Sequence, residues 1–227
     1  MTTFNKDLTE TETPESMSAA IMEGLAFVSK VFWGPELEYC RAIHQEDGLA
    51  ISMEFAFLSN AEPFNATIEK IGTFVGSYQD GEDLFQSLET EFVALFISNR
   101  EGIPAPLYHS CYSGSEETGS QPLLMGEPAV EMRKRLTDVG LALAGESNEL
   151  PDHLCIEIEY LYFLLSEGWT KGNEGRLAEG RRFAGEWMLP WIRRFKGRLV
   201  NVDEGGFYTL VAGLLLELLT IIANEAS

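Results

Sequence analysis

The stretch NELPDHLCIEIEYLYFLL, residues 148–165, decides the fold of this chain. Within it, Leu154, Ile158, Leu161 and Leu165 recur at helical spacing and form one face, and other apolar side chains cover most of the remaining surface. A helix that is apolar nearly all round belongs in the interior of a protein. We therefore expect a buried central helix with other helices packed around it.

Pro151, Asp152 and His153 stand at the head of this segment. Proline fits the first turn of a helix, where its missing N–H would have no partner, and an aspartate beside it interacts favourably with the helix dipole. In the simplest interpretation Asp152 accepts first-turn N–H groups and His153 bonds to a neighbouring loop. A catalytic pair, one corner of a metal site and the edge of a binding surface are the alternatives.

Helical periodicity recurs along most of the chain, and strand-like alternation is scarce. Asp80 or Asp83 caps one helix, and Pro190 should kink or break another. The fold class is all-α, a single globular helical bundle of about eight to ten helices. The segments with helical character outside the opening stretch are 14–33, 35–59, 61–78, 80–98, 128–143, 173–198 and 206–224.

The domain organisation follows from composition. The polar, acidic composition of residues 1–15 predicts a disordered tail. Residues 16–227 are expected to form one all-helical domain. That domain has an N-terminal part to about residue 143, a linker at 144–150 and a C-terminal part at 151–227. The longest irregular zone, 99–128, is rich in Pro, Gly and Ser, and such a loop inside a compact domain is usually functional or a hinge.

The formal net charge of −20, with a pI near 4.4, limits the class of partner. Binding to nucleic acid or to anionic lipid needs clustered Lys and Arg, so neither is expected. A cationic partner would instead be steered in by this charge. The alternative is that the charge serves solubility alone.

The three cysteines are far apart and form no CxxC pair, which indicates a reduced, cytoplasmic protein. The N-terminus lacks the pattern of a secretion signal. The most apolar run, 207–223, is short for a membrane span and carries Glu217 at its centre, so a buried terminal helix is expected.

Metal and nucleophile motifs are absent from the sequence. The histidines lie in distant segments, and Cys40 with His44 supplies only two ligands on one helix face, so no metal site is expected. Neither GxSxG nor a phosphate-binding loop with a Lys occurs.

Five stretches follow one another in a distinctive order: 89–112, 121–141, 151–165, 183–195 and 207–219. The third carries Pro-Asp-His and the fourth reads FAGEWMLPWIRRF. The first contains the helix end Leu95-Phe96 and then a loop with Pro104, Pro106, Tyr108, Ser110 and Tyr112. Together they resemble the TorD/DmsD family of redox-enzyme maturation chaperones. The chain departs from the family pattern at Glu186-Trp187, where a His is common, and at Leu107-Tyr108, where a Trp is frequent.

The resemblance implies an all-helical cytoplasmic chaperone without catalytic residues, metal or a cofactor of its own. It implies binding of the twin-arginine signal peptide of a molybdopterin oxidoreductase subunit, and help with cofactor insertion before export. A homodimer, domain-swapped about 113–128 or 144–150, is a further expectation. The resemblance leaves open whether guanine nucleotide or the molybdenum cofactor binds directly.

The expected peptide-binding residues lie in the loop and at the helix head. Asp152 would pair with an arginine guanidinium, and His153 would orient that carboxylate or bond to the peptide backbone. The remaining members are Pro104, Pro106, Tyr108, Ser110, Trp191 and Phe96, and plain core packing is the alternative for Pro106, Tyr108 and Trp191. Two other functions stay open: a small helical hydrolase or nucleotide-using enzyme centred on Asp152 and His153, and a scaffold subunit of a membrane oxidoreductase.

Overall fold

The computed structural model describes residues 14–45, 62–98, 100, 102–114, 125–141 and 149–224. In these ranges all regular elements are helical, and a lone bridge between Tyr108 and His153 is the one β-type pairing. The all-α fold class is confirmed. The α-helices are α1 (Pro14–Trp33), α2 (Leu37–His44), α4 (Glu62–Gly76), α5 (Gly81–Phe92), α6 (Glu127–Asp138), α7 (Leu154–Lys171), α8 (Glu174–Arg182), α9 (Leu189–Val202) and α10 (Phe207–Asn224).

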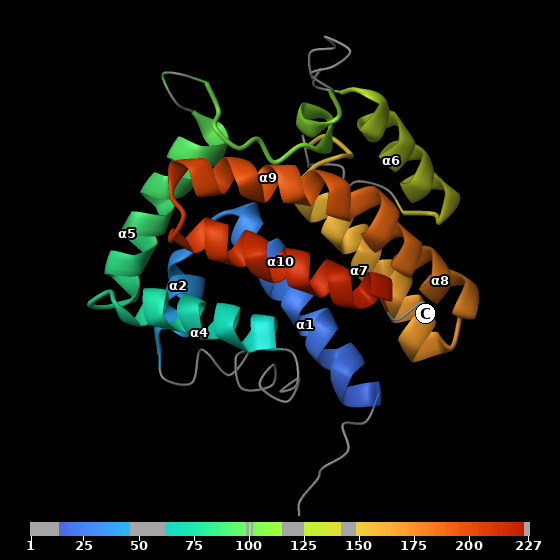
Figure 1. The fold of residues 1–227 in the computed structure, drawn as a ribbon, viewed down its shortest axis with the longest axis horizontal. Coiled ribbons are helices and arrows are strands. Elements are labelled where there is room, and N and C mark those ends of the chain that lie inside the picture. The colour runs from blue at the N-terminus through green and yellow to red at the C-terminus, as the bar shows by residue number, and fades with distance from the viewer. Residues whose placement is uncertain are drawn as a thin grey trace, which may run out of the picture.

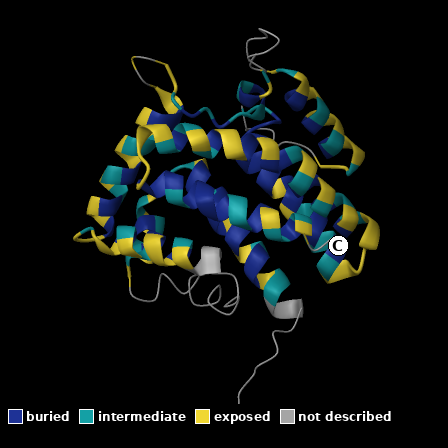
Figure 2. Ribbon diagram, viewed as in Figure 1, coloured by how far each residue is buried: buried dark blue, intermediate teal, exposed yellow. Residues whose placement is uncertain are grey.

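The bundle is organised around α7 and α10 (Figure 1). Helix α1 packs on both of them, α4 and α9 pack on α10, α8 packs on α7, and α2 lies against α5. Buried residues gather where these helices face one another (Figure 2). The predicted N-terminal and C-terminal parts of the chain therefore share one core, because α1 from the first part packs on two helices of the second.

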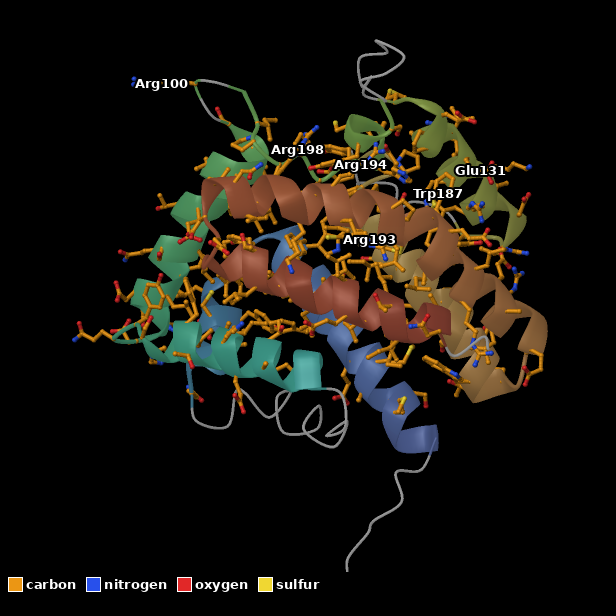
Figure 3. All side chains as sticks on the ribbon, in the orientation of Figure 1. Arg100, Glu131, Trp187, Arg193, Arg194 and Arg198 are labelled. Atoms are coloured by element: carbon orange, nitrogen blue, oxygen red, sulfur yellow. The ribbon has the colours of Figure 1, made fainter. Side chains whose placement is uncertain are left out.

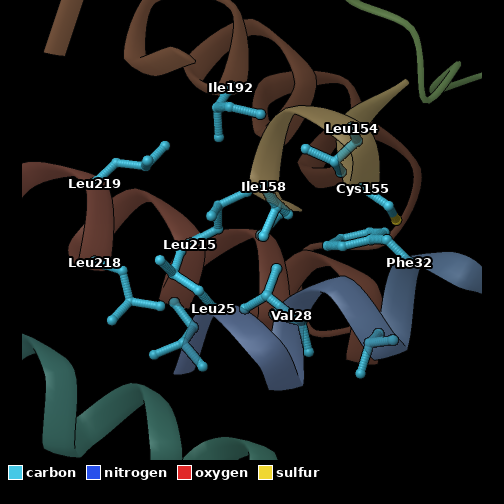
Figure 4. Packing of buried hydrophobic residues seen from close by; sticks show 14 of the residues in the cluster. Leu25, Val28, Phe32, Leu154, Cys155, Ile158, Ile192, Leu215, Leu218 and Leu219 are labelled. Atoms are coloured by element: carbon cyan, nitrogen blue, oxygen red, sulfur yellow. The ribbon is translucent and has the colours of Figure 1, made fainter. Parts of the chain in front are cut away.

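The centre of the core is built from aliphatic side chains of four helices. Figure 4 shows Leu25 and Val28 of α1 facing Ile158 of α7 and Leu215 of α10, with Ile192 of α9 nearby. All five are at most 1% exposed. The expectation of a buried central helix at 154–165 is confirmed, since most of α7 from Leu154 to Leu165 is buried.

Several helix ends have local causes. Gly34 has φ 119°, a non-helical conformation that L-residues rarely adopt. The chain therefore leaves the path of α1 at this glycine. The Asp80 side chain accepts the N–H of Asp83 at 2.9 Å and caps α5, so Asp80 rather than Asp83 is the cap. Helix α2 ends at His44, well before the predicted residue 59, and residues 46–61 lie outside the described part of the chain.

Pro190 lies in the first turn of α9, directly after a π-helical turn at Phe183–Met188. A wider turn accommodates both the proline ring and the missing N–H, so the helical path changes geometry here and does not stop. A second π-helical turn, Val93–Ile97, follows α5 and leads into the predicted irregular zone. In the described part of that zone, His109–Tyr112 form a short 3₁₀ helix before α6 begins at Glu127.

Other predicted boundaries differ from those in the structure or fall outside the described residues. Helix α6 begins at Glu127 and ends at Asp138, short of the predicted residue 143. Helix α1 already begins at Pro14, so 14 and 15 are not part of a tail. Residues 1–13 of the predicted tail, 115–124 of the loop and 144–148 of the linker lie outside the described ranges.

Helix α10 is long and apolar enough to cross a membrane by length and composition alone. However, 61% of that stretch is buried inside the protein, where it packs on α1, α4 and α9. Glu217, midway along it, accepts a hydrogen bond from the Thr67 hydroxyl of α4 at 2.8 Å. Burial raises the pKa of this carboxyl group. These contacts are those of a core helix, as the sequence predicted.

Candidate functional site

Helix α7 begins at Leu154, and His153 is its N-cap. The Nδ1 atom of His153 accepts the N–H of Cys155 at 3.2 Å. The prediction that Pro151 occupies the first turn and that Asp152 caps it is therefore wrong. The reason is the loop at 102–114, which pairs with the residues before the helix. Leu154 donates its N–H to the carbonyl of Leu107 at 2.8 Å, and this pairing keeps His153 extended.

Asp152 binds the loop and not its own helix. Its Oδ2 atom accepts the backbone N–H of Ser110 at 2.9 Å and also accepts the Ser110 hydroxyl. Its backbone carbonyl accepts the N–H of His109 at 3.0 Å. Asp152 is 0% exposed, and no described residue bonds to its Oδ1 atom. In this conformation, its carboxylate fixes the loop and does not reach the surface.

His153 is packed between two aromatic rings. The indole of Trp33 stacks on it with centroids 4.9 Å apart and planes 16° apart, and Tyr108 meets it edge-on at 5.3 Å. Burial lowers the pKa of His153 to about 4, against the opposing charges of Glu149 and Asp152. His153 is therefore neutral at pH 7, and since Nδ1 acts as an acceptor its proton lies on Nε2.

A second buried carboxylate, Glu157, was not predicted from the sequence. It is 0% exposed and accepts three ring N–H groups. His109 Nδ1 at 3.0 Å and Trp187 Nε1 at 2.9 Å bond to Oε1, and Trp191 Nε1 at 2.9 Å bonds to Oε2. His109 also stacks on Trp191, with centroids 5.1 Å apart. The signal for this site was an acidic residue on the face of an otherwise apolar helix.

Helix α9 holds the other side of the loop through two arginines (Figure 3). Arg198 donates to the carbonyl of Cys111 at 3.2 Å and lies 4.4 Å from the Tyr112 ring centre. Arg194 donates to the carbonyl of Tyr112 at 2.6 Å. Within the loop, the Tyr112 hydroxyl donates to the carbonyl of Pro106 at 2.9 Å. Side chains of α7 and α9 therefore fix the loop from two sides.

The predicted peptide-binding residues fall into three groups. Tyr108, Ser110, Asp152 and His153 form one contact network at the head of α7, and Trp191 joins it through Glu157 and His109. Pro104 and Pro106 lie in the same loop and are partly exposed.

Phe96 is separate from this network. It is 4% exposed and packs against Phe32, Phe92, Phe195 and Tyr208 in the core. Core packing, the alternative for Trp191, describes Trp191 as the structure has it, and Phe96 is a core residue as well. Peptide binding by any of the eight residues stays a prediction.

One surface adjoins the head of α7, and we call it the aromatic-acidic face: the exposed Trp33, Glu159 and Tyr162 with the partly exposed Tyr108 and Glu149. Trp33 is 41% exposed and Tyr162 is 40% exposed. The Trp33 indole donates to Glu159 Oε1 at 2.9 Å, and the Tyr108 hydroxyl donates to Glu149 Oε2 at 2.6 Å. Sequence reasoning missed Trp33 because it looked like the last apolar residue of a core helix.

No group of three or more His, Cys, Asp or Glu side chains that could hold a metal ion occurs within the described ranges. Cys40 is buried in the core, and the ring of His44 bonds through Nε2 to the carbonyl of Tyr78 at 2.9 Å. The shared helix face of these two residues therefore has another use.

Comparison with known proteins gives a consistent family. Residues 58–196, more than half of the chain, match the family described as nitrate reductase delta subunit. The chaperone protein TorD of Aliivibrio fischeri is 31% identical over 176 residues, which cover 73% of this chain and 77% of that protein. TorD of Vibrio parahaemolyticus is 24% identical, covering 83% and 89% of the two chains, and TorD of Escherichia coli is 26% identical, covering 72% and 76%.

A solved structure from Archaeoglobus fulgidus, assigned to redox enzyme maturation, aligns over 95% of this chain and 99% of its own with 18% identity and a TM-score of 0.46. The curated relatives are named chaperones, not enzymes, so the hydrolase alternative has no support from them. The chain belongs to the family described as nitrate reductase delta subunit and to the TorD chaperones, and it is a chaperone and not an enzyme.

Proposed function

We propose that this chaperone acts in the cytoplasm on a molybdopterin oxidoreductase. It binds the twin-arginine signal peptide of the catalytic subunit and holds the subunit until the cofactor is inserted, before export. Membership of the TorD family supports the role as a chaperone of such enzymes. Binding of the signal peptide is the more specific proposal, and the surface at the head of α7 supports it.

The observation that carries the proposal is the aromatic-acidic face. A twin-arginine leader is cationic at its start and apolar after it. Half-exposed rings at Trp33 and Tyr162 offer stacking area, and carboxylates at Glu149 and Glu159 offer partners for cations. The net charge of −20 adds long-range attraction for the cationic part.

The predicted residues then divide by role. Tyr108, Pro104 and Pro106 are partly exposed, so they can contact a peptide directly. Asp152 and Ser110 are buried and bond to each other, so their part is to fix the loop that carries those contacts. His153 supports the rings of Trp33 and Tyr108 from below. The surface is thus presented by an inner layer of polar and aromatic contacts.

Calorimetric titration with a synthetic leader tests the proposal. The probes are twin-arginine leaders of molybdopterin oxidoreductases encoded beside this chaperone, each paired with the same peptide carrying two lysines. Micromolar or tighter binding is expected, weaker for the lysine peptides because an ammonium group cannot form the planar bidentate pair. If none of these leaders binds, the proposal is contradicted. A domain-swapped dimer remains a separate prediction, checked by light scattering across a concentration series.

A further inference from the structure

Trp33 and Glu159 join two helices at the surface. Trp33 is the last residue of α1, and Glu159 lies in the second turn of α7. The indole Nε1 atom donates to Glu159 Oε1 at 2.9 Å. No described residue forms a hydrogen bond or ion pair with Oε2, and Glu159 is exposed. A carboxylate held by one oxygen and open at the other can receive a second donor without rearranging.

The Trp33 ring beside Glu159 is held in place. Trp33 stacks on the buried His153 with an angle of 16° between the planes, so the indole orientation is fixed from below. Tyr162 follows Glu159 by three positions on α7, so the two side chains lie on neighbouring points of one helix face. Glu159 therefore adjoins two half-exposed aromatic residues, Trp33 through the hydrogen bond and Tyr162 along the helix.

The nearby cation on α1 does not neutralise this carboxylate. Lys30 lies one turn before Trp33 and pairs with Glu36 at 2.5 Å. Asp152, the residue that the sequence pointed to for arginine binding, is 0% exposed and bonded to Ser110. Of the two carboxylates, Glu159 is the exposed one.

We infer that Trp33, Glu159 and Tyr162 form the subsite that receives an arginine of the client's leader and rejects lysine. This inference rests on the proposed function. The guanidinium group is planar, so it pairs with both oxygens of a carboxylate while a face of the same group lies on an aromatic ring. A lysine ammonium is a compact, strongly hydrated charge and gains less from that arrangement. Glu159 is thus a specificity-determining residue.

The experiment compares Glu159→Gln with Glu204→Gln, using a twin-arginine leader and its two-lysine counterpart in calorimetric titrations. Glu204 is exposed in the turn between α9 and α10 and is not a member of the subsite, so its replacement removes the same charge and leaves the subsite carboxylate in place. Trp33→Phe is the third variant, because phenylalanine keeps a ring over His153 and removes the N–H that positions Glu159. Urea unfolding of each variant checks that the fold is retained.

Glu159→Gln is expected to weaken binding of the arginine peptide about ten-fold, the effect of one charge-assisted hydrogen-bonded pair. Binding of the lysine peptide should change much less, so the preference for arginine falls. Glu204→Gln should weaken binding of both peptides slightly and to the same extent. Trp33→Phe should also lower the preference.

Two other results are informative in different ways. If the wild-type chaperone prefers arginine and Glu159→Gln behaves like Glu204→Gln with both peptides, the subsite inference is wrong and the proposed function stands. If the wild-type chaperone binds neither peptide, the proposed function fails and the inference falls with it.

Discussion

The carboxylate of Asp152 accepts both the backbone N–H and the hydroxyl of Ser110, a residue 42 positions earlier in the chain. Both residues are buried, at 0% and 1% exposure. The contact ties the loop at 102–114 to the residues that precede α7. The loop carries Tyr108, so this buried bond positions one end of the aromatic-acidic face.

Ser110→Ala should destabilise the protein by about 1–3 kcal/mol, because it leaves a buried carboxylate oxygen with one donor fewer. Asp152→Asn should cost as much or more, since an amide donor would then face the hydroxyl or the N–H. The double variant should lose less than the sum of the two, because both changes break one contact. Urea unfolding of the four proteins measures this coupling. Strictly additive losses would show that the two side chains do not act on each other.

Glu157→Gln tests the buried carboxylate that collects three ring N–H donors. Glutamine offers a single acceptor oxygen and turns an N–H₂ group toward at least one donor, so a loss of about 3 kcal/mol is expected. The tryptophan fluorescence should change as well, because Trp187 and Trp191 both bond to this side chain. Glu167→Gln, on the same helix but in an exposed pair with Lys171, is the control and should be nearly neutral. Equal losses for the two variants would contradict the role of Glu157.

His153 makes stability depend on pH in a definite direction. Its pKa is lowered to about 4 in the folded chain, from an ordinary value of 6.5, chiefly by burial. Below pH 6.5 the unfolded chain therefore binds a proton that the folded chain does not. Stability should fall as the pH drops from about 6.5 to about 4, by at most about 1.4 kcal/mol per pH unit from this group.

His153→Asn provides the comparison for that titration. Asparagine keeps an acceptor at the N-cap position and has no charge to gain. The variant should be less stable at pH 7, where it lacks the ring stacked on Trp33, but its stability should fall less steeply between pH 6.5 and 4. Denaturant unfolding at several pH values gives both slopes. Parallel curves for the two proteins would mean that His153 does not titrate in this window.

Two glycines inside helices should respond oppositely to alanine. At Gly168 of α7 an added Cβ would lie 2.6 Å from Cβ and 3.0 Å from Cα of Leu177, so α8 would have to move and stability should drop by about 1–3 kcal/mol. At Gly197 of α9 an added Cβ would meet nothing within 4 Å, so alanine should stabilise the helix by about 0.5–1 kcal/mol. Thermal unfolding of the two variants should show shifts of opposite sign, and a tolerated Gly168→Ala would disprove the close approach of α7 and α8.

The helical elements and the burial of α7 could be predicted because they depend on neighbours along the chain. Apolar residues at helical spacing, Asp80 as a cap and Gly34 as a terminator act within a few positions. The sequence placed Pro-Asp-His at the head of this helix, but the roles of Asp152 and His153 were exchanged. His153 caps the helix and Asp152 binds a distant loop, because the pairing of Leu154 with Leu107 delays the start of the helix.

The sequence by itself determined the all-α class, most helix positions, the acidic charge and the family resemblance, all of which follow from local periodicity, composition and motif order. Only the tertiary structure decided which polar groups meet. Glu157 finds its donors 30 to 48 positions away, and Trp33 finds Glu159 126 positions away. A buried carboxylate needs donors from whichever segments surround it, and that surrounding exists only once α1, α7 and α9 have packed together. The same packing buried Asp152 and left Glu159 exposed, although both are acidic residues at the start of one apolar segment.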